Sequence, residues 1–465
     1  MAVTHWFMKR LSRFRILPEY KSIMSNYRPP VNHDMQTLDR SFFKKDIPLI
    51  AAKFSKPQYL PKFMKSCADE IINVPNIKHI VTINDSKAIL LKDSITKLED
   101  CSPETQEKFK EFGIELEPYT LHLDYWFWKS DEILNAIIPK VGNEDVPSGF
   151  TAAGHLAHLN LRDEYKKYGK IIGEVILDKN PAIKTVVDKK NTIKNEFRTF
   201  PIELLAGEEN YVVEQTESGC KFTFDFSKVY WNSRLAREHE RLIEKFGPGE
   251  VVGDVMAGVG PFAVPSGKKG TIVLANDLNP ESYKYLQQNI EQNKVESFVK
   301  AYNIDGRKFI EDAAQILSQF AQRPIEKRVT KRVKDKSGHK SIKQTETITV
   351  QVPKFYHHFV MNLPDSALTF LDAYIGLYSK TPEIKDEPGF KLPWIHVHCF
   401  EKFEPQEEPT DEELHRRIWV KICKLVNYEL DMSKMEFHEV RMVSPTKPMF
   451  CVSFQLPEEV AFRNV

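Results

Sequence analysis

The sequence predicts an α/β protein in which a mostly parallel seven-stranded sheet follows two smaller N-terminal α+β domains. A chain of 465 residues exceeds one ordinary core, so two or three domains are expected. From about residue 228 onward, short apolar runs alternate with helical patterns, as a doubly wound sheet requires. A glycine-containing turn follows the first of these runs and an acid ends the second, which is typical of a β-α-β unit that binds a nucleoside.

The C-terminal domain, residues 228–465, should supply the seven strands. They are expected at residues 251–256, 271–276, 298–303, 356–361, 394–400, 436–443 and 449–456. The last two are close together, with Pro445 and Pro448 in the turn between them. This spacing predicts an antiparallel hairpin at the end of the sheet.

The first of the smaller domains is expected at residues 36–140. Strands are predicted at 47–54 and 80–83, and a charged helix that Ser102 caps should end at Phe112. An aromatic-rich amphipathic helix is predicted from Asp124 to Ile138.

A polar turn from Gly142 to Ser148 marks the boundary with a middle domain, residues 141–227. Its β-like runs are 171–177, 202–205, 211–213 and 222–226. Short runs of this kind predict strands.

Composition excludes several classes of protein. The chain has 66 Lys and Arg against 65 Asp and Glu, so any nucleic-acid surface must be a local patch. The 6 cysteines include no C-x-x-C pair, which argues against structural zinc or a disulfide framework, and we expect no metal. No apolar run approaches the length of a membrane span.

Residues 1–35 form a basic leader. Lys9, Arg10, Arg13 and Arg15 precede the first acid, Glu19, among apolar residues. Both a mitochondrial presequence and a disordered basic tail fit this composition. Met24 lies before a Pro-Pro break, so a start at this residue would yield the same protein without the basic segment.

A second basic segment, residues 322–354, interrupts the alternation of strands and helices between the third helix and the fourth strand. Its cations include Arg323, Lys327, Arg328, Lys331, Arg332, Lys334, Lys336, Lys340 and Lys343. It has too few apolar residues to contribute to a core. We expect an exposed, solvated loop, with phosphate binding as the alternative.

The cofactor motif is Asp254-Val-Met-Ala-Gly-Val-Gly-Pro-Phe262. Gly258 and Gly260 allow the backbone to approach a ligand closely, and Asp277 is placed to hold ribose hydroxyls. Ala263 occupies the third glycine position of the dinucleotide fingerprint. Together with Asn279-Pro280 after the acid, the motif resembles that of S-adenosylmethionine (AdoMet) methyltransferases of the Rossmann-like class I fold, which we favour over a nicotinamide enzyme.

Two further strand ends carry polar residues. Asn362 and Pro364 follow the fourth strand and should line the transfer site, because ligands lie beyond the carboxyl ends of parallel strands. The alternative is a turn that merely begins the next helix. Asp305 follows the third strand, where it can bind adenine, cap a helix that begins at Arg307, or do both.

The chain resembles a known family, the eukaryotic and archaeal tRNA (guanine-37-N1)-methyltransferases, and it resembles the fungal members most. The resemblance extends from about residue 37 to the end and depends on several long motifs in the same order. They are residues 149–162, 195–207, 230–241, the cofactor loop, 362–364 and 444–448.

The resemblance implies methyl transfer from AdoMet to N1 of guanosine 37 of tRNA, immediately 3′ of the anticodon, which supports maintenance of the reading frame. This nitrogen carries a proton, so the reaction needs a base, and charge that develops on O6 needs a cation. The resemblance implies that Glu238 is the base and Arg198 the O6 stabiliser, with Asn362 and Pro364 holding the guanine. Ser233 is expected to cap the helix that carries Glu238.

The resemblance also implies a set of cofactor contacts. They are His239, Asp277, Leu278, Asp305, Gly306 and Asn362, with Tyr230, Gly258 and Gly260 nearby and Lys190 close to the substrate. His239 replaces an arginine of the archaeal members, and an imidazole adds little charge at pH 7.

For the tRNA partner, the resemblance implies that residues 36–140 reach the elbow and that the middle domain lies over the anticodon stem. Lys184, Lys189, Lys190 and Lys194 would then lie near phosphates. We expect a monomer, without membrane contact, in the mitochondrial matrix, nucleus and cytoplasm.

Two other readings remain open. A cytosine C5 methyltransferase needs a nucleophilic cysteine beside the fourth strand, where this chain has Asn362-Leu-Pro-Asp365. A non-catalytic RNA-binding protein with a degenerate cofactor fold is less consistent with the sequence, because Gly258, Gly260, Asp277 and Asn362 are all intact.

Overall fold

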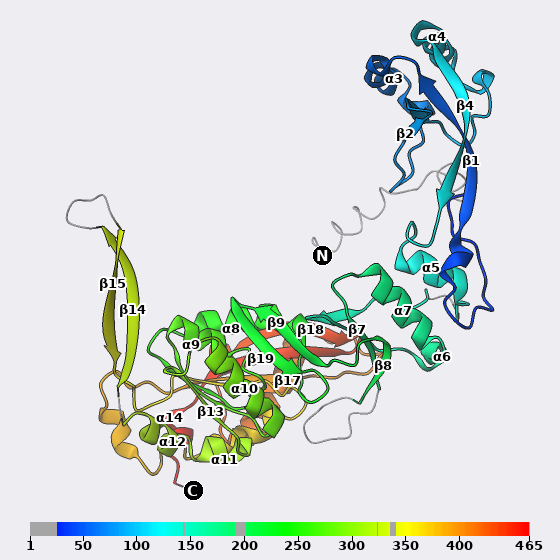
Figure 1. Cartoon of the computed structure of the whole chain (residues 1–465). Helices are drawn as coiled ribbons and strands as arrows, with labels where there is room; N and C mark the ends of the chain where they lie inside the picture. The colour runs from blue at the N-terminus through cyan, green and yellow to red at the C-terminus, as the bar shows by residue number, and fades with distance from the viewer. Residues whose placement is uncertain (1–25, 143–144, 191–200, 323, 335–340, 465) are drawn as a thin grey trace. The chain divides into compact units, whose positions relative to one another are not determined.

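The computed structural model describes residues 26–142, 145–190, 201–322, 324–334 and 341–464 (Figure 1). The chain divides into two compact units. The first comprises residues 1–150, 159–188 and 204–208, and the second comprises 151–158, 189–203 and 209–465. Most of the predicted leader, together with Lys194 and Arg198, lies outside the described residues.

The second unit contains a seven-stranded sheet, which confirms the predicted fold class. In spatial order its strands are β13 (Val299–Tyr302), β12 (Ile272–Asn276), β11 (Val251–Asp254), β16 (His358–Met361), β17 (Trp394–Phe400), β19 (Lys447–Gln455) and β18 (Glu436–Ser444). Neighbouring strands from β13 to β17 are parallel. β19 runs antiparallel to both of its neighbours, β17 and β18. All seven strands were predicted, although Pro448 lies in β19 and not in the turn.

Helices flank this sheet (Figure 1). They are η5 (Ser233–Leu235), α8 (Ala236–Lys245), α9 (Ala263–Lys269), α10 (Pro280–Gln292), α11 (Gly306–Glu311), α12 (Ala313–Phe320), η6 (Ala367–Tyr374), η7 (Pro382–Asp386), α13 (Asp411–Val426), η8 (Met432–Lys434) and α14 (Glu458–Ala461). Every residue of β11, β12 and β16 is buried. Parallel strands covered on both faces have this continuous burial, which explains their unbroken apolar runs.

Two hairpins precede the sheet in the chain. One pairs β5 (Thr151–Ala153) with β6 (Leu156–Leu159), and the other pairs β9 (Val212–Glu217) with β10 (Cys220–Asp225). The turn between β9 and β10 has positive φ at Ser218 and Gly219. Asn289 of α10 accepts a hydrogen bond from the Thr223 backbone N–H at 2.8 Å, which fixes this hairpin to the α/β core.

The basic segment between α12 and β16 is a long antiparallel hairpin, β14 (Ile325–Lys334) and β15 (Ser341–Val350), in which Ile325 pairs with Val350. The prediction of a loop is therefore wrong. Val, Ile and Thr recur through both halves of the segment, and such residues favour strands even where charges prevent a core.

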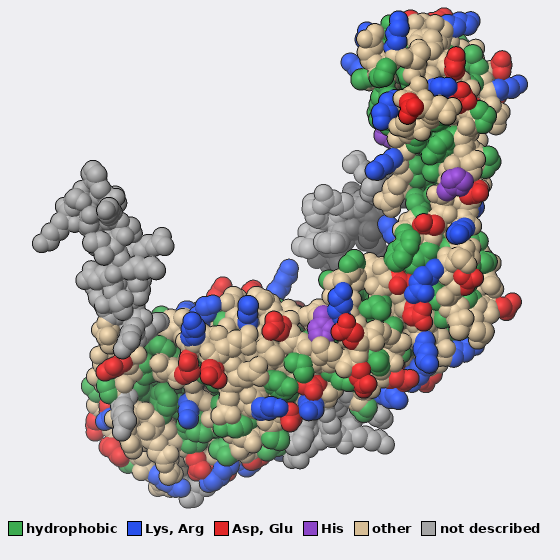
Figure 2. Space-filling model, viewed as in Figure 1, with side chains coloured by type: hydrophobic (Ala, Val, Ile, Leu, Met, Phe, Trp, Pro, Cys, Tyr) green, Lys and Arg blue, Asp and Glu red, His purple; other side chains and the backbone are tan. Residues whose placement is uncertain are grey.

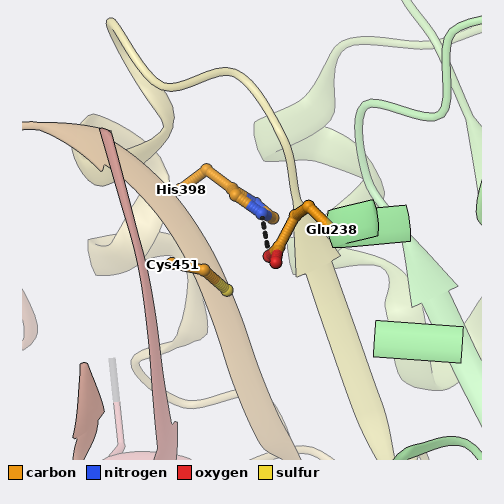
Figure 3. Close-up of side chains that lie close together, drawn as sticks. All are labelled: Glu238, His398 and Cys451. Atoms are coloured by element: carbon orange, nitrogen blue, oxygen red, sulfur yellow. Dashed lines mark hydrogen bonds and ion pairs between the residues drawn. The ribbon is translucent and has the colours of Figure 1, made fainter. Parts of the chain in front are cut away.

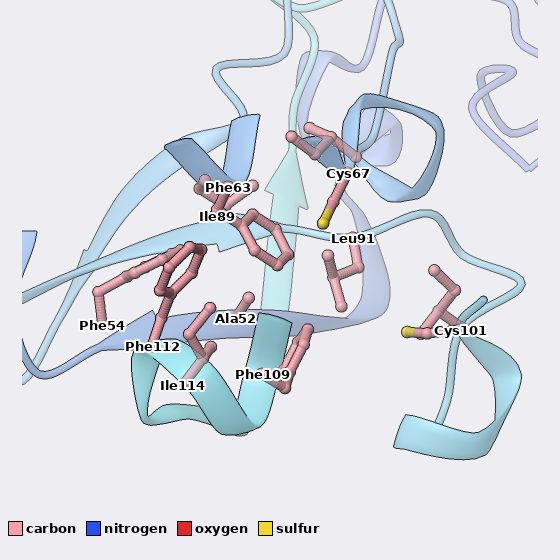
Figure 4. Close-up of a cluster of buried hydrophobic side chains, with 12 residues drawn as sticks. Ala52, Phe54, Phe63, Cys67, Ile89, Leu91, Cys101, Phe109, Phe112 and Ile114 are labelled. Atoms are coloured by element: carbon pink, nitrogen blue, oxygen red, sulfur yellow. The ribbon is translucent and has the colours of Figure 1, made fainter. Parts of the chain in front are cut away.

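The first unit contains a four-stranded sheet of β2 (Ile80–Ile83), β3 (Ser86–Leu90), β1 (Lys45–Phe54) and β4 (Ile114–Leu123), in that order. Its helices are η1 (Arg40–Phe43), η2 (Pro57–Tyr59), α3 (Leu60–Ser66), η3 (Ala68–Glu70), η4 (Leu98–Asp100) and α4 (Pro103–Phe112). Side chains of α3, α4, β1 and β3 form an apolar cluster around Phe54, Phe63 and Phe109 (Figure 4). The cap was predicted correctly, because Ser102 Oγ accepts from the Thr105 backbone N–H at 3.3 Å.

Two predictions for the first unit are wrong. The helix expected at 124–138 is confined to α5 (Ser130–Ile137), because the Asp124 side chain accepts from the Trp126 backbone N–H and forms a turn first. The strand expected at 171–177 is a helix, α7 (Gly169–Lys179), which follows α6 (Asp163–Lys166). The buried Ile171, Ile172, Val175 and Ile176 recur at helical spacing.

Asp178 of α7 joins parts of the first unit that are far apart in sequence. It accepts from Arg40 Nε at 2.8 Å and from the Tyr125 hydroxyl at 2.9 Å. The division between the two units passes through β6, β7 (Thr185–Lys189) and β8 (Ile202–Gly207). No helix among the described residues is long and apolar enough to cross a membrane. Figure 2 shows acidic and basic side chains interspersed on the face in view, in keeping with the balanced charge.

Candidate active site

The glycine turn after β11 is present as predicted. Gly258 has φ +56° and Gly260 has φ +97°, the left-handed region that favours glycine. A Cβ on Gly260 would lie 2.7 Å from Leu286 Cδ1 and 2.9 Å from Val264 Cγ2, whereas one on Gly258 would meet nothing within 4 Å. Gly260 is thus required by space and backbone angle, and Gly258 by backbone angle alone.

Asp277 joins this turn to the loop after β12. Its Oδ2 accepts from the Gly258 backbone N–H at 2.8 Å, and its Oδ1 accepts from the Asn279 N–H at 2.9 Å. Burial raises the pKa of Asp277, and the hydrogen bonds from Gly258 and Asn279 offset part of the rise. The side chain of the neighbouring Leu278 is 40% exposed.

Asp305 and Gly306 lie where β13 meets α11. Asp305 Oδ1 accepts from the backbone N–H groups of Arg307 at 2.9 Å and Lys308 at 3.2 Å, so the predicted cap is present and the helix begins one residue early, at Gly306. A Cβ on Gly306 would lie 3.3 Å from Val255 Cγ1 in the loop after β11. The ends of β11 and β13 therefore converge, as a nucleoside site requires.

Asp254, the last residue of β11, has an unusual environment. It is completely buried, and neither carboxylate oxygen has a hydrogen-bond partner among the described residues. Burial, and secondarily the nearby Asp277, raise the pKa of Asp254 well above its usual range. A buried carboxyl group without partners is costly unless a donor completes it. No role was predicted for Asp254, although its place at the end of a buried strand was a usable signal.

Asn362 and Pro364 follow β16, at the predicted end of the fourth strand. Asn362 Oδ1 is buried, again without a partner among the described residues. The Pro364 carbonyl oxygen accepts from the Phe400 N–H at 3.1 Å, which fixes the loop to the end of β17. The loop thus presents an unsatisfied acceptor on a fixed backbone.

Glu238 lies in the first turn of α8. Asn232, and not Ser233 as predicted, supplies the cap of the preceding η5, through a 3.2 Å bond from the Arg234 N–H. The buried residues of α8 are Glu238, His239, Leu242 and Ile243. These buried pairs recur after four residues, so they lie on one face of the helix, and both Glu238 and His239 point into the protein.

The Glu238 carboxylate belongs to an ion-pair network. Arg241 Nε is 2.7 Å from Oε2 and Arg241 Nη2 is 2.8 Å from Oε1. His398 Nε2, from β17, is 2.8 Å from Oε1 (Figure 3). His438 Nε2, from β18, is 3.5 Å from Oε2.

The network sets the charges of its members. Burial favours the neutral acid at Glu238, but the hydrogen bonds from Arg241 and His398 outweigh it and hold the pKa of Glu238 well below its usual range. Burial lowers the pKa of His398, whereas Cys451 and Glu238 raise it, with a net result of about 9. The pair is therefore carboxylate and imidazolium at neutral pH.

Cys451 of β19 lies beside this pair, and one donor atom from each of Glu238, His398 and Cys451 falls within 4.8 Å of the others (Figure 3). Three such donors are also a candidate metal site. However, both oxygens of Glu238 already accept from Arg241 and His398, and a metal ion would face the guanidinium group. We regard the cluster as an ion-pair network.

The same network leads to the Asn362 loop. His398 Nδ1 is 3.4 Å from the carbonyl oxygen of Met361, the residue before Asn362. The candidate base and the candidate guanine-binding loop are thus joined through one imidazole.

His239 and Tyr230, both predicted cofactor contacts, differ in burial. His239 Nδ1 is 2.5 Å from Glu217 Oε1, and its ring meets Phe262 edge-on at 4.7 Å. Tyr230 is 48% exposed. A small pocket is lined by Lys189, Ile202, Phe226, Val229, Tyr230 and Trp231.

The predicted lysines differ in environment. Lys189 Nζ lies 4.8 Å from the centre of the Phe226 ring, and burial, with Arg234 nearby, lowers the pKa of Lys189 to about 8. Lys190 Nζ is 3.3 Å from Glu203 Oε2, and Lys184 is exposed. Arg198 and Lys194 lie outside the described residues, so their predicted roles stay predictions.

Sequence reasoning also missed Arg241, His398 and His438. One signal was available for His398, because His396 and His398 alternate along a strand that was predicted, which places both on one face of the sheet.

Comparison with known proteins identifies the family. Residues 213–334 match the TRM5/TYW2 methyltransferase domain, and residues 130–210 match the TYW2 N-terminal domain. The chain is 64% identical to the tRNA (guanine(37)-N(1))-methyltransferase of Candida albicans, over 95% of this chain and 100% of that protein. It is 46% identical to the enzyme of that name from Saccharomyces cerevisiae, over 93% and 95% of the two chains.

A solved structure agrees in fold. Trm5b from Pyrococcus abyssi superposes with a TM-score of 0.53 at 22% identity, over 87% of this chain and 98% of that one. The full-length similarity to the fungal enzymes, together with this fold, shows that the chain belongs to the tRNA (guanine(37)-N(1))-methyltransferase family.

Proposed function

We propose that this protein transfers the methyl group of AdoMet to N1 of guanosine 37 in tRNA, immediately 3′ of the anticodon. The observation that carries the proposal is the buried Glu238, which His398 joins to the loop of Asn362 and Pro364 at the carboxyl end of β16. The C. albicans relative bears the name of this activity.

The chemistry needs a group that removes the N1 proton while the nitrogen attacks the methyl carbon. Glu238 is the base in this proposal, because a carboxylate held ionised at neutral pH can accept a proton as the new bond forms. Asn362 Oδ1 is a buried acceptor without a partner among the described residues, and it suits an N–H group of the guanine. Arg198 is proposed to stabilise charge on O6.

AdoMet supplies a methyl group on a positively charged sulfur. Asp277 is proposed to hold the ribose, with Asp305, Gly306 and Leu278 around the adenine and Gly258 and Gly260 allowing close approach of the backbone. The orphaned carboxyl group of Asp254 fits a cationic amine, since one such donor would complete both of its oxygens. His239, Tyr230 and Lys190 are proposed to lie at the edges of the cofactor and substrate.

A Glu238→Gln variant tests the proposal. With an anticodon stem-loop that has guanosine at position 37, we expect single-turnover methyl transfer to fall by roughly 10²–10⁴-fold while AdoMet still binds in calorimetry. Glu240→Gln is the matched control, because Glu240 is an exposed acid on the same helix. Equal rates for Glu238→Gln and the wild type would exclude Glu238 as the base. If a stem-loop with adenosine at position 37 were methylated as fast as the one with guanosine, guanosine 37 would not be the specific target.

We further propose that the protein acts as a monomer in the mitochondrial matrix, nucleus and cytoplasm. The basic, acid-free residues 1–18 and the internal Met24 support two products from one gene. Light scattering checks the mass in solution. Fluorescent fusions that begin at residue 1 or 24 check the distribution, and we expect only the longer one in mitochondria.

A further inference from the structure

The three residues that contact the Glu238 carboxylate differ in their ability to take a proton from it. Arg241 has no acceptor atom. His398 is completely buried, and its Nδ1 faces the Met361 carbonyl oxygen while its Nε2 faces Glu238. The Met361 carbonyl oxygen and the Glu238 carboxylate both only accept hydrogen bonds, so both ring nitrogens of His398 donate and the ring has no free lone pair.

His438 is the contact that reaches solvent. Its side chain is 46% exposed, and its Nε2 lies 3.5 Å from Glu238 Oε2, whereas the Glu238 side chain is only 2% exposed. His438 of β18 lies opposite Cys451 of β19 in the sheet register, and Cys451 lies opposite His398 of β17 on its other side. The sheet register thus holds His438 at the solvent edge of the same network.

Charged groups on α8, β17 and β18 act on the pKa of His438. Burial lowers its pKa, as do Arg241 of α8 and His398 of β17, while Glu238 of α8 and Glu439 of β18 raise it by less. Cys451 of β19 lies opposite it. The net effect is a neutral ring at pH 7, which can accept a proton at Nε2 and carry one at Nδ1.

We propose that His438 carries away the proton that Glu238 removes from guanosine N1 and releases it to water. This inference depends on the proposed function and extends it. The N1–H bond breaks as the nitrogen forms its bond to the methyl carbon, and the S–CH₃ electron pair stays on sulfur. The proton passes from Glu238 Oε2 to His438 Nε2, and the ring then loses a proton to solvent, which restores both groups.

A route for this proton is needed because the surroundings of Glu238 favour its ionised form, whereas its side chain is buried and cannot release the proton directly to water. Arg241 and His398 both favour its ionised form. A protonated Glu238 would also leave two cationic partners beside a neutral group in a buried site, which is unfavourable. Among the described contacts of this carboxylate, His438 alone combines an accepting nitrogen with access to water.

The test uses the full-length protein, AdoMet and a guanosine-37 tRNA transcript. His438→Ala should complete its first turnover at a near wild-type rate, because Glu238 begins ionised, and then slow at least about tenfold in later turnovers. Imidazole in the buffer should restore those later turnovers. The wild-type pH profile should include a step from His438 that the variant lacks.

His415→Ala is the matched control. His415 is a partly buried histidine of α13 that stacks on Phe437, the residue next to His438, at 4.5 Å. It should leave both phases and the imidazole response unchanged. Melting curves of the variants establish that each is folded.

Two outcomes would overturn the inference. Later turnovers of His438→Ala that match the wild type would show that the proton has another route. Slow turnovers that imidazole does not restore would show that His438 only positions Glu238. If instead the wild type fails to methylate guanosine 37, or Glu238→Gln reacts at full rate, the proposed function itself fails, whatever His438 does.

Discussion

At the scale of single residues, Gly258 and Gly260 show how two similar positions in one motif can have different physical requirements. Gly258→Ala should cost about 1–2 kcal/mol of unfolding free energy, the typical penalty of left-handed backbone for a residue with a Cβ. Gly260→Ala should cost more, because its Cβ would also lie 2.7 Å from Leu286 and 2.9 Å from Val264.

Thermal melts of the two variants measure this difference, and calorimetry with AdoMet measures its effect on the site. We expect weaker AdoMet binding in both, with Gly260→Ala the worse. Equal stability of the two variants would mean that Leu286 and Val264 move aside, and the crowding at Gly260 would then not explain its identity.

The same scale shows what could be predicted for the site. Asp277, Asp305 and Asn362 lie just beyond the carboxyl ends of β12, β13 and β16, as expected from the apolar runs before them. The carboxyl ends of parallel strands meet at one edge of the sheet. The partners of Glu238 could not be predicted in this way. His398 and His438 are 160 and 200 residues further along the chain, and the pairing of β17, β18 and β19 alone brings them to α8.

At the scale of elements, the central strands β11, β12 and β16 were found because burial on both faces leaves continuous apolar runs. Segments rich in Val and Ile caused two errors. The short apolar run at α7 was predicted as a strand, because such a run does not distinguish a strand from a helix. The β14–β15 segment was predicted as a loop, although a high content of charged residues does not exclude a strand. Tertiary packing decides in the first case, and strand propensity together with cross-strand hydrogen bonds in the second.

The attachment of α8 to the sheet should stabilise the protein in a pH-dependent way. The helix contacts the sheet partly through ion pairs, Glu238 with His398 at 2.8 Å and Lys245 with Glu436 at 2.6 Å. The pKa of His398 is raised from 6.5 to about 9 in the folded protein, so its contribution to stability is complete below pH 6.5 and disappears as the pH rises through 9.

A His398→Gln variant should therefore be less stable than the wild type at pH 6, by roughly 2 kcal/mol for a charged hydrogen bond, and the difference should shrink toward pH 10. Urea unfolding across this pH range measures it, with His415→Gln as the control. A difference that grows with pH would mean that His398 is neutral in the folded protein, which would remove the charged pair from the site.

At the scale of the whole molecule, we expect cofactor chemistry and tRNA recognition to belong to different parts of the chain. The predicted elbow-binding domain, residues 36–140, includes residues near both of its ends that contact other parts of the first unit. Arg40 and Tyr125 both contact Asp178 of α7, so removing residues 1–140 would take away partners that α7 needs. A truncation at that boundary would confuse a loss of tRNA binding with a loss of structure.

The register of β1 and β4 provides a cleaner excision. Lys45 pairs with Leu123, so residues 46–122 leave and return at neighbouring points, and a short glycine-containing turn can join them. The excised part holds its own apolar cluster, while Arg40, Tyr125, α5 and α7 all remain. We expect this variant to bind AdoMet as the wild type does and to bind full-length tRNA more weakly.

The loss should depend on the length of the RNA, because a domain that contacts the tRNA elbow contributes nothing to an isolated anticodon stem-loop. Methylation of the stem-loop should therefore be equal for the variant and the wild type, whereas tRNA binding should differ most at low salt, where phosphate contacts are strongest. Equal tRNA affinity at every salt concentration would assign recognition to the catalytic and middle parts of the chain. Weaker AdoMet binding would instead show that residues 46–122 support the fold of the site.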